Sequence, residues 1–137
     1  MANRDQPVNG KRSTLSLLKT GNVILTDADY SIVWSTNTNS SKPLELFLFD
    51  TGNLVLREHT TNGFVLWQSF DYPTDTLLPE QSFTRYMNLV SSKSDNKYSS
   101  GYYKLIFDND NVLRLLYDGP QVSSIYWPYP WLVSWDA

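Results

Sequence analysis

The sequence of 137 residues contains no cysteine, which excludes disulfide bonds and thiol chemistry. This absence does not decide the compartment, because large secreted β domains can be stable without disulfides. There is a single histidine, His59, in a polar segment between two apolar stretches. Hydrolase chemistry needs a base beside a nucleophile, and neither a G-x-S-x-G motif nor a glycine-rich phosphate loop occurs. The sequence therefore predicts a protein that is not an enzyme.

Positive charge and long apolar runs are also scarce. Fourteen acidic and eleven basic residues give a net charge of −3, and they are scattered without a basic stripe. This distribution argues against a nucleic-acid partner. No apolar run approaches about 18 residues, so the sequence predicts no membrane span. The polar N-terminal segment, residues 1–12, lacks the apolar centre of a secretory signal peptide.

Residues 108–111, which read DNDN, resemble the start of a calcium-binding loop. An EF-hand loop would then need glycine at its sixth position and glutamate at its twelfth. Leu113 and Gly119 occupy those positions instead. The segment is better interpreted as a polar hairpin turn, and we expect neither a metal nor another cofactor.

The most informative feature of the chain is an internal repeat. Three residues of the first copy recur 31 positions later, and a tryptophan recurs 33 positions later because the second loop is longer. The matched pairs are Leu15 and Leu46, Gly21 and Gly52, Asn22 and Asn53, and Trp34 and Trp67. A weaker third copy covers residues 105–127, with Asn111 and Trp127 in the equivalent places. Such a short unit cannot bury its apolar face alone, so several copies must pack together.

Each copy has the pattern of a β-hairpin followed by a third strand. Apolar residues alternate on both sides of the turns KTGN (19–22) and DTGN (50–53), in which glycine supplies a positive φ. The third strands, predicted at 31–35 and 64–69, carry the tryptophans. No amphipathic pattern longer than about two helical turns occurs, so we predict an all-β chain.

The composition changes twice along the second half of the chain. Segment 71–81, DYPTDTLLPEQ, holds two prolines and two aspartates and predicts a domain boundary. Residues 91–100 are rich in serine, lysine and asparagine, and strands are predicted to resume at 101–107. The C-terminal tail is dense in aromatic residues, among them Trp127, Trp131 and Trp135, and would form an aggregation-prone apolar patch if exposed. We therefore expect that the chain ends inside a domain.

Two polar features have alternative interpretations. The repeated asparagines can present hydrogen-bonding groups to a saccharide, or they can simply follow tight turns, which the residues alone favour. The sequon Asn39-Ser40-Ser41 can be a glycosylation site if the chain is exported, or a chance match within a polar loop. Both alternatives for the sequon are left open.

Six segments carry a resemblance to a known family: ANRDQPV (2–8), LLKTGNVIL (17–25), VWSTNT (33–38), DTGNLVLRE (50–58), LWQSFDYPTDTLLP (66–79) and LIFDNDNVLRLLYDGP (105–120). They resemble the extracellular S-domain of plant G-type lectin S-receptor-like serine/threonine kinases. This bulb-type lectin region is similar to monocot mannose-binding lectins and S-locus glycoproteins. The resemblance implies a β-prism, in which three small antiparallel sheets surround a pseudo-threefold axis with tryptophans packed inside.

In such a prism, Trp34 and Trp67 occupy two of the core positions, and Trp127 is a further core candidate. The first sheet is expected to be largely missing. Residues 1–80 would form a bulb-type lectin domain that lacks its N-terminal part. Residues 81–137 would form the opening segment of a second, incomplete lectin-like domain.

The mannose site of the resembled family has the pattern Q-x-D-x-N-x-V-x-Y. Aligned on the repeated asparagines, only the asparagine is kept in all three copies, and leucine or phenylalanine replaces the glutamine. The degenerate sugar-binding candidates are Thr20, Asn22 and Thr26, then Thr51, Asn53 and Arg57, then Asn109 and Asn111. Each lost charge-assisted bond is worth roughly 1.5–3 kcal/mol, so the resemblance implies a lectin fold with weak or absent mannose binding.

The expected function is non-catalytic recognition of an extracellular peptide, protein or glycan. By resemblance, the chain would lie at the extracellular face of the plasma membrane, as part of a signalling glycoprotein that can form a receptor oligomer. Its kinase is absent from this sequence. The alternatives are a free-standing mannose-binding lectin and a truncated product without a stable function. Because a missing sheet leaves open edges, we expect the isolated chain to be soluble only as an oligomer or aggregate.

Overall fold

The computed structural model describes residues 3–128, which divide into two compact units. Unit 1 comprises Met1–Tyr72 and Leu78–Glu80, and unit 2 comprises Pro73–Leu77 and Gln81–Ala137. The chain therefore passes from one unit to the other within the segment 71–81. Among the described residues, the only helical element is a short 3-10 turn, η1 (Ser69–Asp71).

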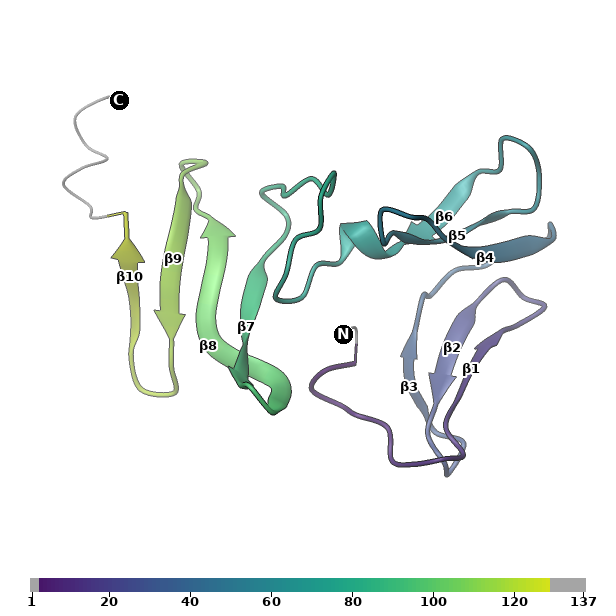
Figure 1. Ribbon diagram of the computed structural model, residues 1–137, viewed down its shortest axis with the longest axis horizontal. Helices are drawn as coiled ribbons and strands as arrows, with labels where there is room; N and C mark the ends of the chain where they lie inside the picture. The colour runs from purple at the N-terminus through teal and green to yellow at the C-terminus, as the bar shows by residue number, and fades with distance from the viewer. Residues whose placement is uncertain (1–2, 129–137) are drawn as a thin grey trace. The chain divides into compact units, whose positions relative to one another are not determined.

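Unit 1 contains two antiparallel sheets of three strands each, which follow one another along the chain (Figure 1). The first sheet has the order β1-β2-β3 and the second has the order β4-β5-β6. Their strands are β1 (Thr14–Leu17), β2 (Val23–Thr26), β3 (Ile32–Ser35), β4 (Leu44–Leu48), β5 (Leu54–Glu58) and β6 (Val65–Gln68). Each sheet corresponds to one copy of the repeat.

The glycine turns form as the sequence predicts. In the first copy the Gly21 amide donates to the Leu18 carbonyl at 2.9 Å, and the Leu18 amide donates to the Asn22 carbonyl at 2.8 Å. The second copy repeats both bonds, with Gly52 in place of Gly21. Gly21 and Gly52 have φ values of +88° and +89°, a region in which only glycine is free of strain.

A β-bulge precedes the tryptophan in both copies. Trp34 lies opposite Leu25 and Trp67 lies opposite Leu56, and the register shifts by one residue immediately before each tryptophan. The ring centroids of the two indoles lie 5.5 Å apart in an edge-to-face arrangement. The two tryptophans therefore join the two sheets.

The interior of unit 1 is small. Within the described residues, the fully buried hydrophobic side chains are Val23, Val55 and Leu56, whereas Trp34 and Trp67 are half-buried. Leu15 and Leu48, which lie on the same faces as the tryptophans, are exposed. The all-β class is confirmed, and the two small antiparallel sheets are of the kind that the resemblance implies. The oligomeric state of the isolated chain stays a prediction.

Unit 2 contains one antiparallel sheet among its described residues, with the order β10-β9-β8-β7 (Figure 1). Its strands are β7 (Leu89–Ser94), β8 (Lys97–Phe107), β9 (Leu113–Asp118) and β10 (Ser123–Trp127). The polar segment 91–100, expected to interrupt the strands, instead forms the hairpin between β7 and β8. Pairing between the two strands satisfies the backbone there, so alternating apolar residues are not required.

Trp127 requires a correction, because its side chain is 48% exposed rather than part of a core. It lies on β10, which is an outer strand of its sheet, and the described part of unit 2 contains no second sheet to cover it. Its register nevertheless repeats that of unit 1, because Trp127 pairs with Leu115 and follows a bulge. Trp131 and Trp135 lie outside the described residues.

Candidate functional site

The carboxamide of Asn22 forms hydrogen bonds that hold the first sheet together, an arrangement that we call the brace. Its Oδ1 accepts a hydrogen bond from the Thr36 hydroxyl at 3.0 Å and a longer one from the Thr38 amide at 3.4 Å. The Thr36 hydroxyl also accepts the Val23 amide at 3.0 Å, next to β2. The Thr38 hydroxyl in turn donates to the Gly21 carbonyl at 2.7 Å. Asn22 thus holds the chain after β3 against the turn that begins β2.

The second copy contains the same brace with different residues. The Asn53 Oδ1 accepts hydrogen bonds from the Ser69 hydroxyl at 3.3 Å and the Phe70 amide at 3.1 Å. The Ser69 hydroxyl accepts the Leu54 amide at 2.9 Å, and the Asn53 Nδ2 donates to the Gln68 Oε1 at 2.9 Å. Both ends of the Asn53 carboxamide are therefore engaged inside the protein.

A sequence signal for this brace was available but was missed. In both copies a hydroxyl residue stands two positions after the tryptophan, Thr36 after Trp34 and Ser69 after Trp67. The hydroxyl bridges the carboxamide and the first amide of the neighbouring strand. The repeated asparagine therefore has a structural role in both sheets, in agreement with the turn-related interpretation of the residues.

The third copy differs from the predicted alignment by one residue. Its turn is closed by the Asn111 amide, which donates to the Asp108 carbonyl at 2.9 Å, and by the Asp108 amide, which donates to the Val112 carbonyl at 3.0 Å. Asn111 has φ +62° and takes the place of the turn glycines Gly21 and Gly52. Asparagine tolerates this left-handed conformation better than most residues. Val112, which has no carboxamide, occupies the position of Asn22 and Asn53.

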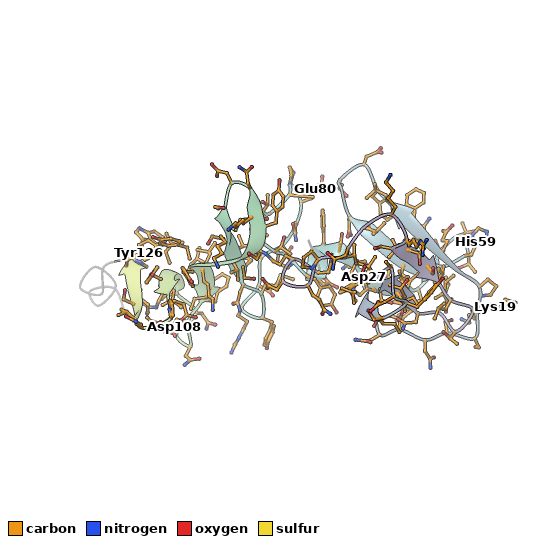
Figure 2. The ribbon with its side chains drawn as sticks, turned by 90° about the horizontal axis from the view of Figure 1, so that it is seen from below. Lys19, Asp27, His59, Glu80, Asp108 and Tyr126 are labelled. Atoms are coloured by element: carbon orange, nitrogen blue, oxygen red, sulfur yellow. The ribbon has the colours of Figure 1, made fainter. Side chains whose placement is uncertain are left out.

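The polar side chains of this third turn bind one another. The Arg114 Nε lies 2.8 Å from an Asp108 carboxylate oxygen, and Arg114 also pairs with Asp110. The Val112 amide, and to a lesser degree Arg114, lower the pKa of Asp110 below its ordinary value. Asn109 is exposed, and its amide donates to Asp108. The turn, with Asp108 labelled in Figure 2, is thus a closed ion-pair cluster.

The threonine candidates do not gather into a pocket with the asparagines. Thr20 is exposed, and its carbonyl accepts the Ser40 amide at 2.9 Å. The Thr26 hydroxyl lies 2.8 Å from the hydroxyl of Thr14 across the β1–β2 pair. The Thr51 hydroxyl accepts the Asn53 amide at 3.4 Å. Thr26 and Thr51 therefore contribute to their own strand pair and turn, and Thr20 holds the connection between β3 and β4.

Arg57 lies in an aromatic and charged cluster on the outer face of the second sheet. Its guanidinium carbon lies 4.8 Å from the ring centroid of Phe47 and 5.5 Å from that of Phe49. Its Nε donates to a Glu45 carboxylate oxygen at 2.8 Å, and His59 Nδ1 lies 3.0 Å from the other oxygen. Val55, directly opposite Phe47, is buried. The valine of the resembled sugar motif is therefore not open to a ligand.

The Arg57 and His59 contacts predict a pH-dependent stability. Hydrogen bonds from Arg57 and then His59 lower the pKa of Glu45 below its ordinary value of 4.5. A lowered folded-state pKa means that ionised Glu45 stabilises the fold above the unfolded pKa, and that this contribution is lost as the pH falls through the folded pKa. We expect thermal melts to show a decrease in midpoint below pH 4.5 that is smaller in Glu45→Gln. An equal decrease in both proteins would contradict the assignment.

The brace gives a second prediction. Replacing Asn53 by alanine leaves the Phe70 amide and the Ser69 hydroxyl without their acceptor, which we expect to cost about 1–3 kcal/mol. Urea unfolding followed by far-ultraviolet circular dichroism measures this loss. Asn109→Ala removes the same group from an exposed turn and is expected to change stability by less than about 0.5 kcal/mol. Equal effects of the two variants would count against the brace.

The described residues include a broad surface depression of about 400 Å³ in unit 1, between the first glycine turn and the start of β4, with Leu17, Leu18 and Pro43 in its lining. Within residues 3–128 no three histidine, cysteine, aspartate or glutamate side chains come together as metal ligands. The same residues contain no helix with the length and apolar character needed to cross a bilayer.

The chain is similar in sequence to several plant proteins, which include receptor kinases and an S-locus glycoprotein. A protein of Zea mays, named as a putative receptor protein kinase, is 45% identical over 94% of this chain and 15% of its own length. A G-type lectin S-receptor-like serine/threonine-protein kinase of Arabidopsis thaliana is 39% identical over 96% of this chain and 17% of its own length. An S-locus-specific glycoprotein of Brassica oleracea var. alboglabra is 35% identical over 96% of this chain and 32% of its own length. The chain thus spans less than a third of each of these relatives.

Among solved structures, the chain is similar to a Polygonatum cyrtonema lectin complexed with monomannoside. The identity is 20% over 89% of this chain and 84% of that one, with a TM-score of 0.37. This score is too low to establish a shared overall arrangement. The sequence profile described as D-mannose binding lectin matches residues 1–100, which is most of the chain. The chain therefore belongs to the D-mannose binding lectin family.

Proposed function

We propose that this chain is a non-catalytic recognition module in the extracellular part of a plant receptor-like serine/threonine kinase, and that its three degenerate sugar positions do not bind mannose. The names of the relatives support the receptor context. Because the chain covers 17% of the Arabidopsis kinase, the catalytic part of such a receptor would lie elsewhere in the protein. The module would then act at the outer face of the plasma membrane.

The observation that carries this proposal is the internal engagement of the repeated asparagines. A mannose hydroxyl competing for Asn53 would have to displace Ser69, Phe70 and Gln68. In the third copy, valine takes the place of the asparagine.

The motif glutamine is replaced in every copy, and threonine replaces the motif aspartate in the first two. In the third copy Asp110 stands at the aspartate position, but its carboxylate pairs with Arg114. The hydrogen bonds that would compensate for this displacement are therefore missing in the first two copies.

The ligand we propose is an extracellular peptide, protein or glycan, and exposed aromatic side chains form its contact surface. Unit 2 presents such a surface on β8–β10, where the ring centroid of Tyr103 lies 5.3 Å from that of Tyr117 and 6.1 Å from that of Tyr126. Tyr126 is labelled in Figure 2. Tyr103, Tyr126 and Trp127 are substantially exposed. Tyrosine and tryptophan are the residues that most often anchor protein partners.

Residues 81–137 belong, in this proposal, to the opening of a second lectin-like domain. The support is the recurrence of the hairpin and of the bulge before a tryptophan. Leu115 and Trp127 repeat the pairing of Leu25 with Trp34. The division at residue 80 and the association into a receptor oligomer are parts of the same proposal.

The second candidate is a free-standing lectin that binds mannose. It is favoured by the match of residues 1–100 to a family described by its binding of D-mannose. The two candidates make opposite predictions about sugar binding. A functional lectin must keep at least one site in which the carboxamide is available to the ligand.

A glycan array followed by titration calorimetry with mannose distinguishes the candidates. We expect no saturable mannose binding, because the loss of two hydrogen bonds of about 1.5 kcal/mol each already weakens a site by about a hundredfold. A known mannose-binding member of the family serves as the positive control. Thr51→Ala tests the second site without removing the brace. Strong mannose binding that Asn22→Ala or Asn53→Ala abolishes would overturn the proposal.

A further inference from the structure

A shallow groove of unit 1 lies beside the sequon. It has a volume of about 360 Å³ and is lined by Thr38, Asn39 and Ser40 on one side and by Glu58, Phe64 and Leu66 on the other. The first side is the connection between β3 and β4, and the second comes from the ends of β5 and β6. Phe64 is 69% exposed at this position. The groove therefore combines an uncovered aromatic ring with a carboxylate.

The chain around Asn39 is held in one place. The Ser40 amide donates to the Thr20 carbonyl at 2.9 Å, and the Ser40 hydroxyl accepts the Lys42 amide at 3.0 Å. Lys42 in turn pairs with Glu58 at 3.0 Å, which ties the connection to the opposite side of the groove. Asn39 itself is exposed, and its carboxamide makes no hydrogen bond to any described residue. The acceptor residue of the sequon is therefore exposed on a connection whose neighbouring residues are held by hydrogen bonds.

We propose that Asn39 carries an N-linked glycan whose first N-acetylglucosamine lies in this groove and covers Phe64. This inference rests on the proposed extracellular location, because the modification requires passage through the secretory pathway. The Asn39 Nδ2 forms a bond to the anomeric carbon of the sugar. The bond from that carbon to the diphosphate of a lipid-linked oligosaccharide breaks, and the amide proton is transferred to a base of the transferring enzyme.

The groove matches the chemistry of the sugar. A pyranose ring has a C–H face that packs against an aromatic ring, and Phe64 presents such a ring within the same groove as the acceptor. The acetamido N–H and the hydroxyls of the sugar need acceptors, which the Glu58 carboxylate provides. Leu66 extends the apolar floor. The structure thus assigns to the glycan a fixed site rather than a free position in solvent.

The test uses the complete chain secreted from a eukaryotic host behind a cleaved signal peptide. Peptide mapping after enzymatic release of the glycan in heavy-oxygen water identifies occupancy of Asn39. Hydroxyl-radical footprinting then compares the oxidation rate of Phe64 in the glycosylated and released forms. Tyr30, which is 86% exposed on the turn at the far end of β3, is the internal control. We expect the Phe64 rate to fall by about twofold or more, because one of its two ring faces is covered, while the Tyr30 rate is unchanged.

Two variants of Ser41 distinguish the effect of the glycan on Phe64 from the effect of the substitution itself. Ser41→Ala removes the sequon and should leave Phe64 fully reactive, whereas Ser41→Thr keeps the sequon and should retain the protection. Occupied Asn39 with an unprotected Phe64 overturns the inference, and so does an unoccupied Asn39 in the secreted chain. Neither result bears on mannose binding, so the failure of this inference is distinguishable from the failure of the proposed function.

Discussion

Replacing Leu56 by alanine is expected to destabilise unit 1 by about 2–5 kcal/mol, the range for truncating a fully buried leucine. Leu56 has no exposed surface and pairs with Leu46 on one side and Trp67 on the other. Few other described side chains of this unit are fully buried, so the truncation removes a large share of its buried apolar contacts. Urea unfolding followed by far-ultraviolet circular dichroism measures the loss.

Leu48→Ala is the matched control for this prediction. Leu48 lies on the same face of the same sheet but is 63% exposed. Its truncation removes an equal number of methyl groups from a position that is already in contact with water, so we expect a loss below about 1 kcal/mol. Similar losses in the two variants would mean that the interior of unit 1 is not organised around Leu56.

Gly21→Ala is expected to have the second-largest effect, because two separate penalties act at this position. The backbone conformation at φ +88° is strained for any residue with a Cβ, at roughly 1–2 kcal/mol. A Cβ at Gly21 would also lie 2.6 Å from the Ser40 amide nitrogen, which is a backbone atom and cannot rotate away. The connection that carries Asn39 must then move, which we expect to add at least about 1 kcal/mol.

Gly10→Ala isolates the first of these penalties. Gly10 has φ +97°, but a Cβ added there meets no atom within 4 Å. The difference in unfolding free energy between the two variants therefore measures the clash with Ser40. Hydrogen exchange provides a local check, because the bond from the Ser40 amide to the Thr20 carbonyl should open only in Gly21→Ala. Equal protection of Ser40 in both variants would contradict the proposed contact.

The hairpins of the two strong copies could be predicted because their signals are local. Alternation of apolar residues sets the strands, and a glycine with positive φ sets each turn, so Leu15 and Gly21 suffice to locate the first hairpin. The predicted alignment of the third copy is wrong by one residue, because it also relied on local residue identity. Matching asparagine to asparagine placed Asn111 with Asn22, whereas the backbone uses Asn111 as a substitute for glycine.

The long strand β8 and the exposure of Trp127 had no local signal. Residues 91–100 lack apolar alternation, yet they pair because each strand satisfies the backbone groups of the other. The burial of a tryptophan depends on whether another layer covers its face. For Trp34 and Trp67 each indole contacts the other, and for Trp127 the described part of unit 2 supplies no such layer.

By itself, the sequence determined the all-β class, the repeat, the glycine turns and membership of a lectin family, because these depend on residue type and on spacing along the chain. The tertiary structure decided what the repeated asparagines do. Asn22 and Asn53 form hydrogen bonds to residues 14 to 17 positions away, beyond their own hairpins. An asparagine looks the same in the sequence whether its carboxamide binds a sugar or other residues of the chain. Only the arrangement of hydrogen-bond donors around it in the folded protein distinguishes these two roles.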